Sequence, residues 1–376
     1  MSNLPPLSLY VHIPWCVQKC PYCDFNAYAL NGQVSYQEYI GHLLSDFDYD
    51  IPLAFGRIIN TIFIGGGTPS LLSISAMQTL LNSICRRLPV SQDVEITMEA
   101  NPGVLEADRF EGYQQAGINR ISIGIQSFNP EKLSSLGRIH SAQEARCAAR
   151  LVARLDLHSF NFDLMHGLPN QSLADAFDDL AQAIAFNPPH LSWYQLTIEP
   201  NTLFGSQPPA LPHDDMLWNI YQHGNRLLTA TGYLQYEISS YAYPGFQCRH
   251  NLNYWRFGDY IGIGCGAHGK LTQMDGTVVR TVKTCNPYSY MQGNYLTKQY
   301  QIAPVDLSIE YFMNRFRLLE TVPRIEFTTF TGQKETAMRP ALDQALADGY
   351  ITESDSHWQV TEKGKLFLNS LLELFM

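Results

Sequence analysis

Three cysteines stand close together near the start of the chain, at Cys16, Cys20 and Cys23. Thiolates at this spacing on one loop can hold three corners of a cubane iron–sulfur cluster, whose usual site has four cysteine ligands. Phe25 and the residues after it supply no fourth cysteine, so one iron would stay open to a small molecule. Zinc is the alternative, with His12 or a distant residue completing its four ligands. It is the weaker interpretation, because His12 falls inside an expected strand.

A run of three glycines, Gly65, Gly66 and Gly67, followed by Thr68 and Pro69, comes after the next apolar segment. Glycines suit a place where backbone must approach a ligand without a Cβ in the way. A tight turn is the simpler explanation of such a run. Further polar groups follow the later apolar segments, at 99–103, 126–128, 163–169 and 195–199.

Each of these groups follows a short apolar run, and the apolar runs alternate with stretches of helical spacing. This alternation indicates parallel strands connected by helices. No G-x-G-x-x-G follows the first strand, so a dinucleotide-binding open sheet has little support. We therefore predict an α/β fold with a partial (β/α)6 barrel, in which the polar groups meet at the C-terminal ends of the strands. The strands are expected over 7–13, 61–64, 94–98, 120–125, 159–164 and 191–196, and the helices over 36–50, 75–88, 106–116, 142–155, 173–186 and 214–230.

The pattern changes past Tyr236, and we expect three parts: the barrel over 1–240, a bridging segment over 241–305 and a C-terminal domain over 306–376. The bridging segment ends in a connection over 285–305. In the C-terminal domain, helices over 336–348 and 364–375 flank a hairpin of 350–352 with 358–360. This mainly helical arrangement resembles a winged helix. Because it is not basic, we expect it to pack or to bind a partner rather than DNA.

Composition narrows the class of protein further. Of the 376 residues, 45% are hydrophobic and 16% are charged, which excludes a disordered chain. The net charge of −10 argues against a nucleic-acid binder, and no apolar run is long enough to span a membrane. The N-terminus lacks the features of a signal peptide, so we expect a cytoplasmic protein. In that reducing compartment, clustered cysteines are ligands or catalysts rather than disulfides.

The cysteine spacing and the glycine run together resemble the signature of the radical S-adenosylmethionine (SAM) superfamily. In that superfamily the amino and carboxylate groups of SAM bind the open iron of a [4Fe–4S] cluster, and an electron from the cluster cleaves SAM to a radical. A closer resemblance, to the oxygen-independent coproporphyrinogen dehydrogenase family, covers nearly the whole chain. It rests on the runs 10–16, 99–103, 120–128, 136–140, 163–169 and 250–255.

This resemblance implies ligand positions. Tyr10, Gly66 and Glu99 would contact the cluster-bound SAM. The adjoining SAM or substrate space would be lined by Gly67, Thr68, Gln126, Arg138 and Asp163. A guanidinium such as that of Arg138 pairs well with a carboxylate. The simpler alternatives are a surface salt bridge for Arg138 and a helix cap or turn for the two acids.

Two departures separate the chain from the dehydrogenase itself. The dehydrogenase has a further cysteine at the position of Phe25, and a long N-terminal segment that helps to close its site, where here only 15 residues precede Cys16. Both departures match the heme-binding branch of the family, which implies a heme chaperone that passes heme to an acceptor protein. The alternatives are oxidative decarboxylation of coproporphyrinogen III and a radical reaction that opens heme. Enzymatic activity is therefore left open, with the chaperone favoured.

The run 250–255 is the candidate heme element. Imidazole is a common axial ligand of heme iron, so His250 is the first candidate ligand, with Tyr254 and Trp255 stacking on the macrocycle. A buried, hydrogen-bonded histidine is the plain alternative, and His268 is the second candidate ligand. The expected partners are heme, an acceptor such as a respiratory enzyme, and an electron donor for the cluster. Peripheral membrane contact and a homodimer are compatible with the sequence.

Overall fold

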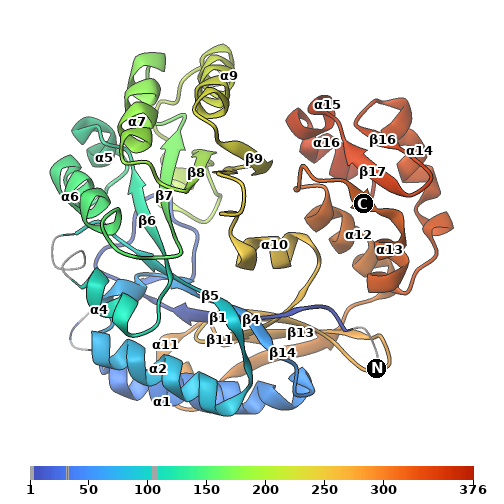
Figure 1. The fold of residues 1–376 in the computed structure, drawn as a ribbon, viewed down its shortest axis with the longest axis horizontal. Coiled ribbons are helices and arrows are strands. Elements are labelled where there is room, and N and C mark those ends of the chain that lie inside the picture. Colours follow the sequence, from blue (N-terminus) through green and yellow to red (C-terminus); the bar gives the residue numbers. More distant parts are fainter. Residues whose placement is uncertain (1–3, 31, 33, 104–108) are drawn as a thin grey trace.

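The computed structural model of the chain describes residues 4–30, 32, 34–103 and 109–376. Its main feature is a long twisted sheet, with the C-terminal part of the chain gathered beside it (Figure 1). The strands of this sheet are β1 (Leu7–Ile13), β4 (Ile59–Gly66), β5 (Val90–Ala100), β6 (Arg120–Gln126), β7 (Ser159–His166), β8 (His190–Gln195), β9 (Leu234–Glu237), β10 (Ser240–Ala242), β11 (Asp259–Ile263), β12 (His268–Thr272), β13 (Val278–Lys283) and β14 (Leu296–Gln301).

Within the described ranges the sheet has twelve strands, in the order β14-β13-β12-β11-β1-β4-β5-β6-β7-β8-β10-β9. Strands β1, β4, β5, β6, β7 and β8 are neighbours in chain order and run parallel. This arrangement confirms the expected partial (β/α)6 barrel. The helices of this part are α1 (Tyr36–Asp50), α2 (Ile74–Arg87), α4 (Phe110–Gln115), α5 (Pro130–Ser135), α6 (Ala142–Val152), α7 (Leu173–Ala185), α8 (Leu203–Ser206) and α9 (Asp214–Ala230).

Serine caps explain why several of these helices begin where they do. The side chains of Ser35, Ser73, Ser141 and Ser172 each accept a backbone N–H from the first turn of α1, α2, α6 and α7. The expected helices over 36–50 and 214–230 are confirmed as α1 and α9. Of the helix expected over 106–116, residues 106–108 lie outside the described residues. No helix among the described residues is long and apolar enough to cross a membrane.

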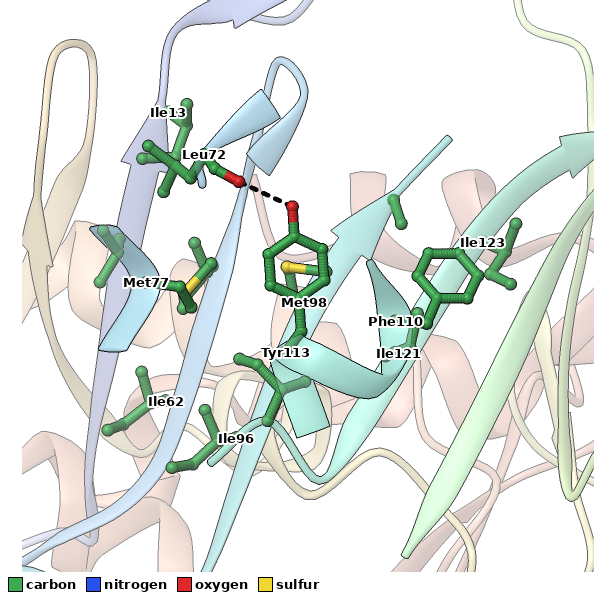
Figure 2. Packing of buried hydrophobic residues seen from close by; sticks show 14 of the residues in the cluster. Ile13, Ile62, Leu72, Met77, Ile96, Met98, Phe110, Tyr113, Ile121 and Ile123 are labelled. Carbon is green, nitrogen blue, oxygen red and sulfur yellow. Dashed lines mark hydrogen bonds between the residues drawn. The ribbon is translucent and has the colours of Figure 1, made fainter. Parts of the chain in front are cut away.

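The barrel core forms between the parallel strands and the helices that cover them (Figure 2). β-Branched residues such as Ile62 and Ile121 are fully buried, which fits strands covered on both faces. Tyr113 enters this core from α4, and its hydroxyl donates to the Leu72 carbonyl at 2.7 Å. The bond satisfies a polar group that would be costly to bury unpaired, and it ties α4 to the loop after β4.

Residues 241–305, expected as a bridging segment, add strands to the barrel sheet. Strand β11 pairs with β1 in parallel, and β12, β13 and β14 follow as antiparallel neighbours. Two helices accompany them, α10 (Arg249–Trp255) and α11 (Pro287–Met291). The expected connection over 285–305 is wrong in detail, since it contains α11 and the edge strand β14. The polar, mostly exposed sequence of β14 lacks the apolar alternation that marks a strand.

The C-terminal unit has a core of its own around Phe312, Phe327 and Trp358. Its small sheet consists of β15 (Val322–Pro323), β17 (His357–Val360) and β16 (Ile351–Glu353), in that order. The expected hairpin is confirmed as the antiparallel pair of β16 and β17. The helix expected over 364–375 is divided at Phe367 into two short helices. The elements are α12 (Pro304–Arg315), β15 (Val322–Pro323), α13 (Arg324–Thr331), α14 (Arg339–Ala347), β16 (Ile351–Glu353), β17 (His357–Val360), α15 (Glu362–Leu366) and α16 (Leu368–Glu373).

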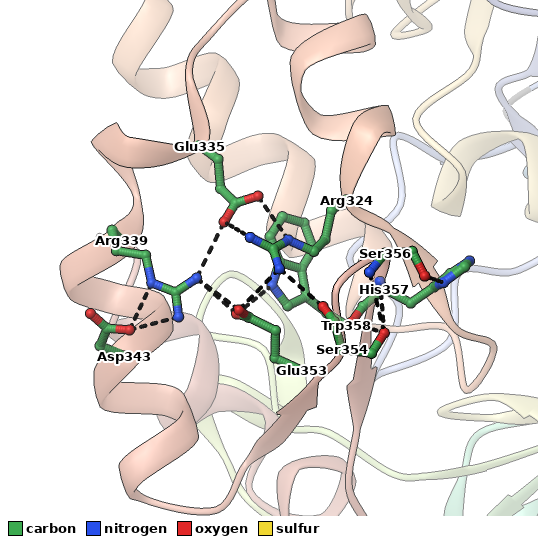
Figure 3. Close-up of polar contacts among 9 residues, drawn as sticks. All are labelled: Arg324, Glu335, Arg339, Asp343, Glu353, Ser354, Ser356, His357 and Trp358. Atoms are coloured by element: carbon green, nitrogen blue, oxygen red, sulfur yellow. Dashed lines mark hydrogen bonds and ion pairs between the residues drawn. The ribbon is translucent and has the colours of Figure 1, made fainter.

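Arginines on the hairpin side of this unit are paired with its own carboxylates (Figure 3). Arg324 contacts Glu335 at 2.6 Å and Glu353 at 3.1 Å. Arg339 contacts Glu353 at 2.8 Å and Asp343 at 2.7 Å. These guanidinium groups therefore join α13, α14 and β16, and their charge is neutralised within the unit.

Candidate cluster and cofactor site

The cysteine loop begins at the C-terminal end of β1. Strand β2 (Trp15–Cys16) pairs in parallel with β3 (Tyr28–Ala29), so the loop between them is closed at its base. Within the loop the Cys23 amide donates to the Cys20 carbonyl at 3.1 Å. All three cysteines are free thiols and line the same cavity, which has a volume of about 490 Å³.

The chemistry of this donor set fits a cluster better than a single ion. In the described part of the chain, no group of three or more His, Cys, Asp or Glu side chains could hold a metal ion. A cubane cluster does not require the three thiols to converge on one atom, because each would bind a different iron. Burial and the neighbouring thiols raise the pKa of Cys16 to about 11, so the bare site holds a neutral thiol there and metal binding must release its proton.

The strand ends meet around the same cavity, as the barrel requires. The residues expected at this site that line it together with the cysteines are Gly66, Gly67, Thr68, Glu99, Gln126, Arg138 and Asp163. Several further residues line the cavity although they were not expected at the site, namely Tyr22, Asn101, Ser122, Ser192 and Tyr194. Ser122, Ser192 and Tyr194 alternate with buried apolar residues along β6 and β8, a weak signal that could have been followed once the strands were placed. Tyr22 and Asn101 lie in loops, where no such periodicity marks them.

The glycine run packs tightly against the cysteine loop. Gly66 has a φ of 108°, and a Cβ added there would lie 2.5 Å from the His12 ring. A Cβ on Gly67 would lie 2.4 Å from the Trp15 carbonyl oxygen, to which the amide of Thr68 donates at 2.7 Å. Both positions therefore require glycine, and the run is held directly beside Cys16.

Two half-buried carboxyl groups, those of Glu99 and Asp163, face this cavity. Burial, reinforced by the charge of Asp163, raises the pKa of Glu99 to about 8, although the Gly66 amide donates to its Oε2 at 3.0 Å. Burial also raises the pKa of Asp163, against hydrogen bonds from Ser122 at 3.0 Å and Asn161 at 2.9 Å. Both acids already accept hydrogen bonds from the protein at the cavity wall, where they could also bind the donors of a ligand.

Two cationic side chains, those of Arg138 and Lys19, are among the described residues that line the cavity. Arg138 is the one that is held in place by side chains and backbone of the barrel. Its Nη2 donates to Asn101 Oδ1 at 2.7 Å and to the Gly124 carbonyl at 2.9 Å, and its Nη1 lies 3.5 Å from Cys20 Sγ. Its Nε is buried and has no hydrogen-bond partner among the described residues. The guanidinium thus points toward the cysteine loop and not toward a surface carboxylate. This orientation suits a group that binds an anionic ligand.

A second cavity of about 400 Å³ adjoins the first, and Phe25, Gly66 and Glu99 line both. Tyr10, expected to contact SAM, lies in this second cavity, where its hydroxyl is 2.9 Å from His12 Nδ1. Its other walls come from α10, from Asn314 of α12 and from the sheet extension, by which we mean strands β11 to β14 (residues 259–301). The cavity therefore lies between the sheet and the C-terminal unit.

His250, the first candidate for heme, lies beneath this second cavity and not in its wall. The side chain is 1% exposed. Its Nδ1 is 2.8 Å from Thr61 Oγ1 and its Nε2 is 3.0 Å from the Tyr254 hydroxyl. Burial and the charge of Arg120 lower the pKa of His250 to about 3. In this structure His250 is a neutral, fully hydrogen-bonded core residue.

Known proteins resemble the whole chain. The "Heme chaperone HemW" of Escherichia coli (strain K12) is 66% identical over 376 residues, which is all of both chains. The protein of the same name from Haemophilus influenzae is 56% identical over all of this chain and 99% of its own. The chain belongs to the HemW family. The family model of the radical SAM superfamily matches residues 10–183, and that of the HemN C-terminal domain matches residues 304–367.

The fold is also that of a solved enzyme. The structure of coproporphyrinogen III oxidase (HemN) from Escherichia coli superimposes with a TM-score of 0.84, covering 99% of this chain and 90% of that one, at 22% sequence identity. The resemblance stated from the sequence is therefore confirmed for both the HemW family and the radical SAM barrel. The barrel, the sheet extension and the C-terminal unit are common to the two proteins as a fold.

Proposed function

We propose that the protein is a heme chaperone, which binds heme and passes it to an acceptor protein. The observation that carries this proposal is the 66% identity, over the full length of both chains, to a relative named as a heme chaperone. The barrel cavity adds a cofactor site to this function. We assign a [4Fe–4S] cluster to Cys16, Cys20 and Cys23, with SAM at the open iron. When bound, the cluster supplies the coordination site and the electron that SAM chemistry requires.

The residues of the cavity suit the two ends of SAM. Gly66 and Gly67 bring backbone beside the cysteine loop, and the Glu99 carboxylate is placed to accept N–H bonds from the amino group. Arg138, next to Cys20, is placed to bind the carboxylate of the ligand in a charge-assisted pair. The deeper part of the cavity, with Thr68, Gln126 and Asp163, offers hydrogen-bond partners to the hydroxyls or ring nitrogens of a nucleoside. Tyr10 borders the same ligand from the second cavity.

Decarboxylation of coproporphyrinogen III is the second candidate function, because the fold matches that of HemN at a TM-score of 0.84. Fold similarity does not carry chemistry by itself. Phe25 favours the chaperone. Its ring stands where the dehydrogenase has a cysteine, is 56% exposed and lines both cavities. The same proposal includes a cytoplasmic location, an acceptor protein for the heme, an electron donor for the cluster and a homodimer.

Reconstitution of the protein, followed by tests with heme and with coproporphyrinogen III, distinguishes these two functions. With iron, sulfide and SAM supplied under anaerobic conditions, we expect it to bind heme stoichiometrically, measured by absorbance, and to leave coproporphyrinogen III unchanged. Transfer of the heme to apo-forms of heme enzymes, followed as recovered activity, tests delivery. Turnover of coproporphyrinogen III on the order of 1 s⁻¹ or faster would identify a decarboxylase instead. Absence of heme binding would refute the chaperone assignment.

Glu99 provides a test of the SAM site. Its carboxyl is largely protonated at pH 7, since burial and Asp163 raise its pKa to about 8. Only the carboxylate accepts hydrogen bonds on both oxygens, so the affinity for SAM should increase between pH 7 and pH 9. Glu99→Gln should weaken binding by about 1.5–3 kcal/mol and remove this dependence. The exposed Glu111→Gln is the control, and parallel pH profiles in wild type and Glu99→Gln would refute the role of Glu99.

A further inference from the structure

A row of polar side chains lies inside the barrel, behind the wall of the first cavity. The register of β6, β7 and β8 places Ser122, Asn161 and His190 opposite one another on the three strands, and all three side chains are buried. Asp163 and Ser192 are paired one layer nearer to the C-terminal strand ends, and both line the cavity. Asn161 and His190 are not among the described residues that line it. Any effect that these two residues have on a ligand must therefore pass through their neighbours.

Asn161 is the centre of this row, and its partners determine how its amide is oriented. Its Nδ2 lies 2.9 Å from Asp163 Oδ1 and 2.7 Å from Ser122 Oγ. Its Oδ1 lies 2.6 Å from His190 Nδ1 and accepts from Ser192 Oγ at 3.2 Å. A carboxylate only accepts hydrogen bonds, so the amide nitrogen must face Asp163 and the amide oxygen must face His190. Ser122 Oγ accepts from Asn161 and donates in turn to Asp163 Oδ2 at 3.0 Å.

The other end of the row fixes the tautomer of His190 in the same sense. The Tyr236 hydroxyl accepts the backbone N–H of Cys248 at 3.3 Å, and its own proton is directed to His190 Nε2 at 2.8 Å. Burial, together with the charge of Arg120, lowers the pKa of His190, so the ring is neutral at pH 7. With Nε2 as the acceptor, the proton of the neutral ring is on Nδ1, which donates to Asn161 Oδ1.

The orientation of Asn161 depends on His190 more than on Ser192. A serine hydroxyl both donates and accepts, so Ser192 could bond either end of the amide. The ring of His190 is held by Tyr236 and fits only the amide oxygen. If the amide turned over, its oxygen would face Asp163, and two acceptors would repel each other. The carboxyl group would then move or take up a proton.

We propose that His190 is a positioning residue of the cofactor site, which fixes the amide of Asn161 and thereby holds Asp163 as a hydrogen-bond acceptor toward the cavity. The inference rests on the proposed binding of SAM and goes beyond it by assigning a role to two residues that do not line the cavity. Asp163 receives one protein donor on each oxygen. Its remaining lone pairs therefore accept from N–H or O–H groups of the ligand, such as the hydroxyls of a nucleoside.

The test compares SAM binding to the reconstituted full chain, measured by equilibrium dialysis, in variants of His190. His190→Leu fills similar space without a donor. We expect its affinity for SAM to fall about tenfold, while the absorbance of the cluster stays at the wild-type level. His190→Asn keeps an amide N–H at the position of Nδ1 and should recover most of the affinity, a rescue that packing alone would not give. His158→Leu is the matched control, because His158 is exposed and lies just before β7, and it should bind SAM as the wild type does.

Two further measurements distinguish positioning from a loss of packing. Asp163→Asn removes the carboxylate, so His190→Leu added to it should lower the affinity for SAM no further, as expected for residues that act as one unit. Nitrogen-15 NMR of the histidine-labelled chain without its cluster should show His190 as the Nδ1–H tautomer. The resonance is assigned by its absence in His190→Asn.

Wild-type affinity for SAM in a folded His190→Leu, judged by circular dichroism, would overturn the role of His190. Equal losses in His190→Leu and His190→Asn, or a full further loss on top of Asp163→Asn, would overturn it as well. An Nε2–H tautomer in the wild type would contradict the direction of the row, even if His190→Leu does not fold. If the wild-type chain carries its cluster but binds no SAM, the proposed cofactor site itself fails, and not only the role of His190.

Discussion

Serine in place of Cys16, Cys20 or Cys23 is expected to abolish the visible absorbance of the reconstituted cluster. Each thiolate anchors one iron, and the loop closed by β2 and β3 leaves no other cysteine among the residues that line the cavity. Serine is a poor substitute, because a hard and weakly acidic hydroxyl replaces a soft thiolate. Iron and acid-labile sulfide per chain should fall together with the absorbance.

Two cysteines outside the barrel cavity are matched controls for this experiment. Cys85 lies on α2 and Cys147 on α6, and both are free thiols away from the site. Cys85→Ser and Cys147→Ser should reconstitute with wild-type iron content. Loss of the cluster in either variant, or its survival in Cys20→Ser, would show that the ligands are misplaced.

The parallel part of the fold could be predicted because its signals are local. Strands β1 and β6 place apolar residues at every second position, and α1 and α9 carry helical spacing between turn residues, so their bounds were found to within a residue. The sheet extension could not be predicted in the same way. The pairing of β11 with β1 joins Leu7 to Asp259 across most of the chain, and no periodicity marks such a partner.

The residues of the candidate site also differ in how far the sequence could place them. The barrel rule was sufficient to bring Gly66, Glu99 and Asp163 to one cavity, since strand ends meet wherever strands run parallel. The rule says nothing about the depth of a side chain. His250 looked available in the run 250–255, but its position on the inner side of α10 buries it against Thr61. Which histidine faces the cavity depends on tertiary packing that the sequence does not display.

A buried charge cluster between α1 and β13 is another feature that the sequence does not display. Lys283, at the end of β13, contacts Asp46 at 2.5 Å and Asp50 at 2.8 Å, and all three side chains are fully buried. Asp46 also accepts from the Gly264 amide at 2.9 Å and from the Tyr290 hydroxyl at 2.7 Å. The cluster thus fixes α1 to the sheet extension and holds the loop that leads into His268.

Removal of the lysine should therefore be strongly destabilising. Lys283→Met leaves two buried carboxyl groups without their cation, and breaking a buried pair in this way costs about 3–5 kcal/mol. The free energy of unfolding, measured with urea at pH 8, should fall by this amount. The exposed Lys298→Met on β14 should change it by less than about 0.5 kcal/mol.

The pH dependence of this loss follows from the carboxyl groups. Burial raises the pKa of Asp50 to about 6, so the folded state binds its proton more tightly than the unfolded chain does. Such a group stabilises the fold below its unfolded pKa, and the contribution is lost as the pH rises through about 6. Without Lys283 the pKa values of both acids rise further, so the difference between wild type and Lys283→Met should narrow from pH 8 to pH 5. Adding Asp50→Asn to Lys283→Met should recover part of the loss at pH 8. A deficit that is the same at both pH values, and that Asp50→Asn does not relieve, would mean that Lys283 acts by packing rather than by charge.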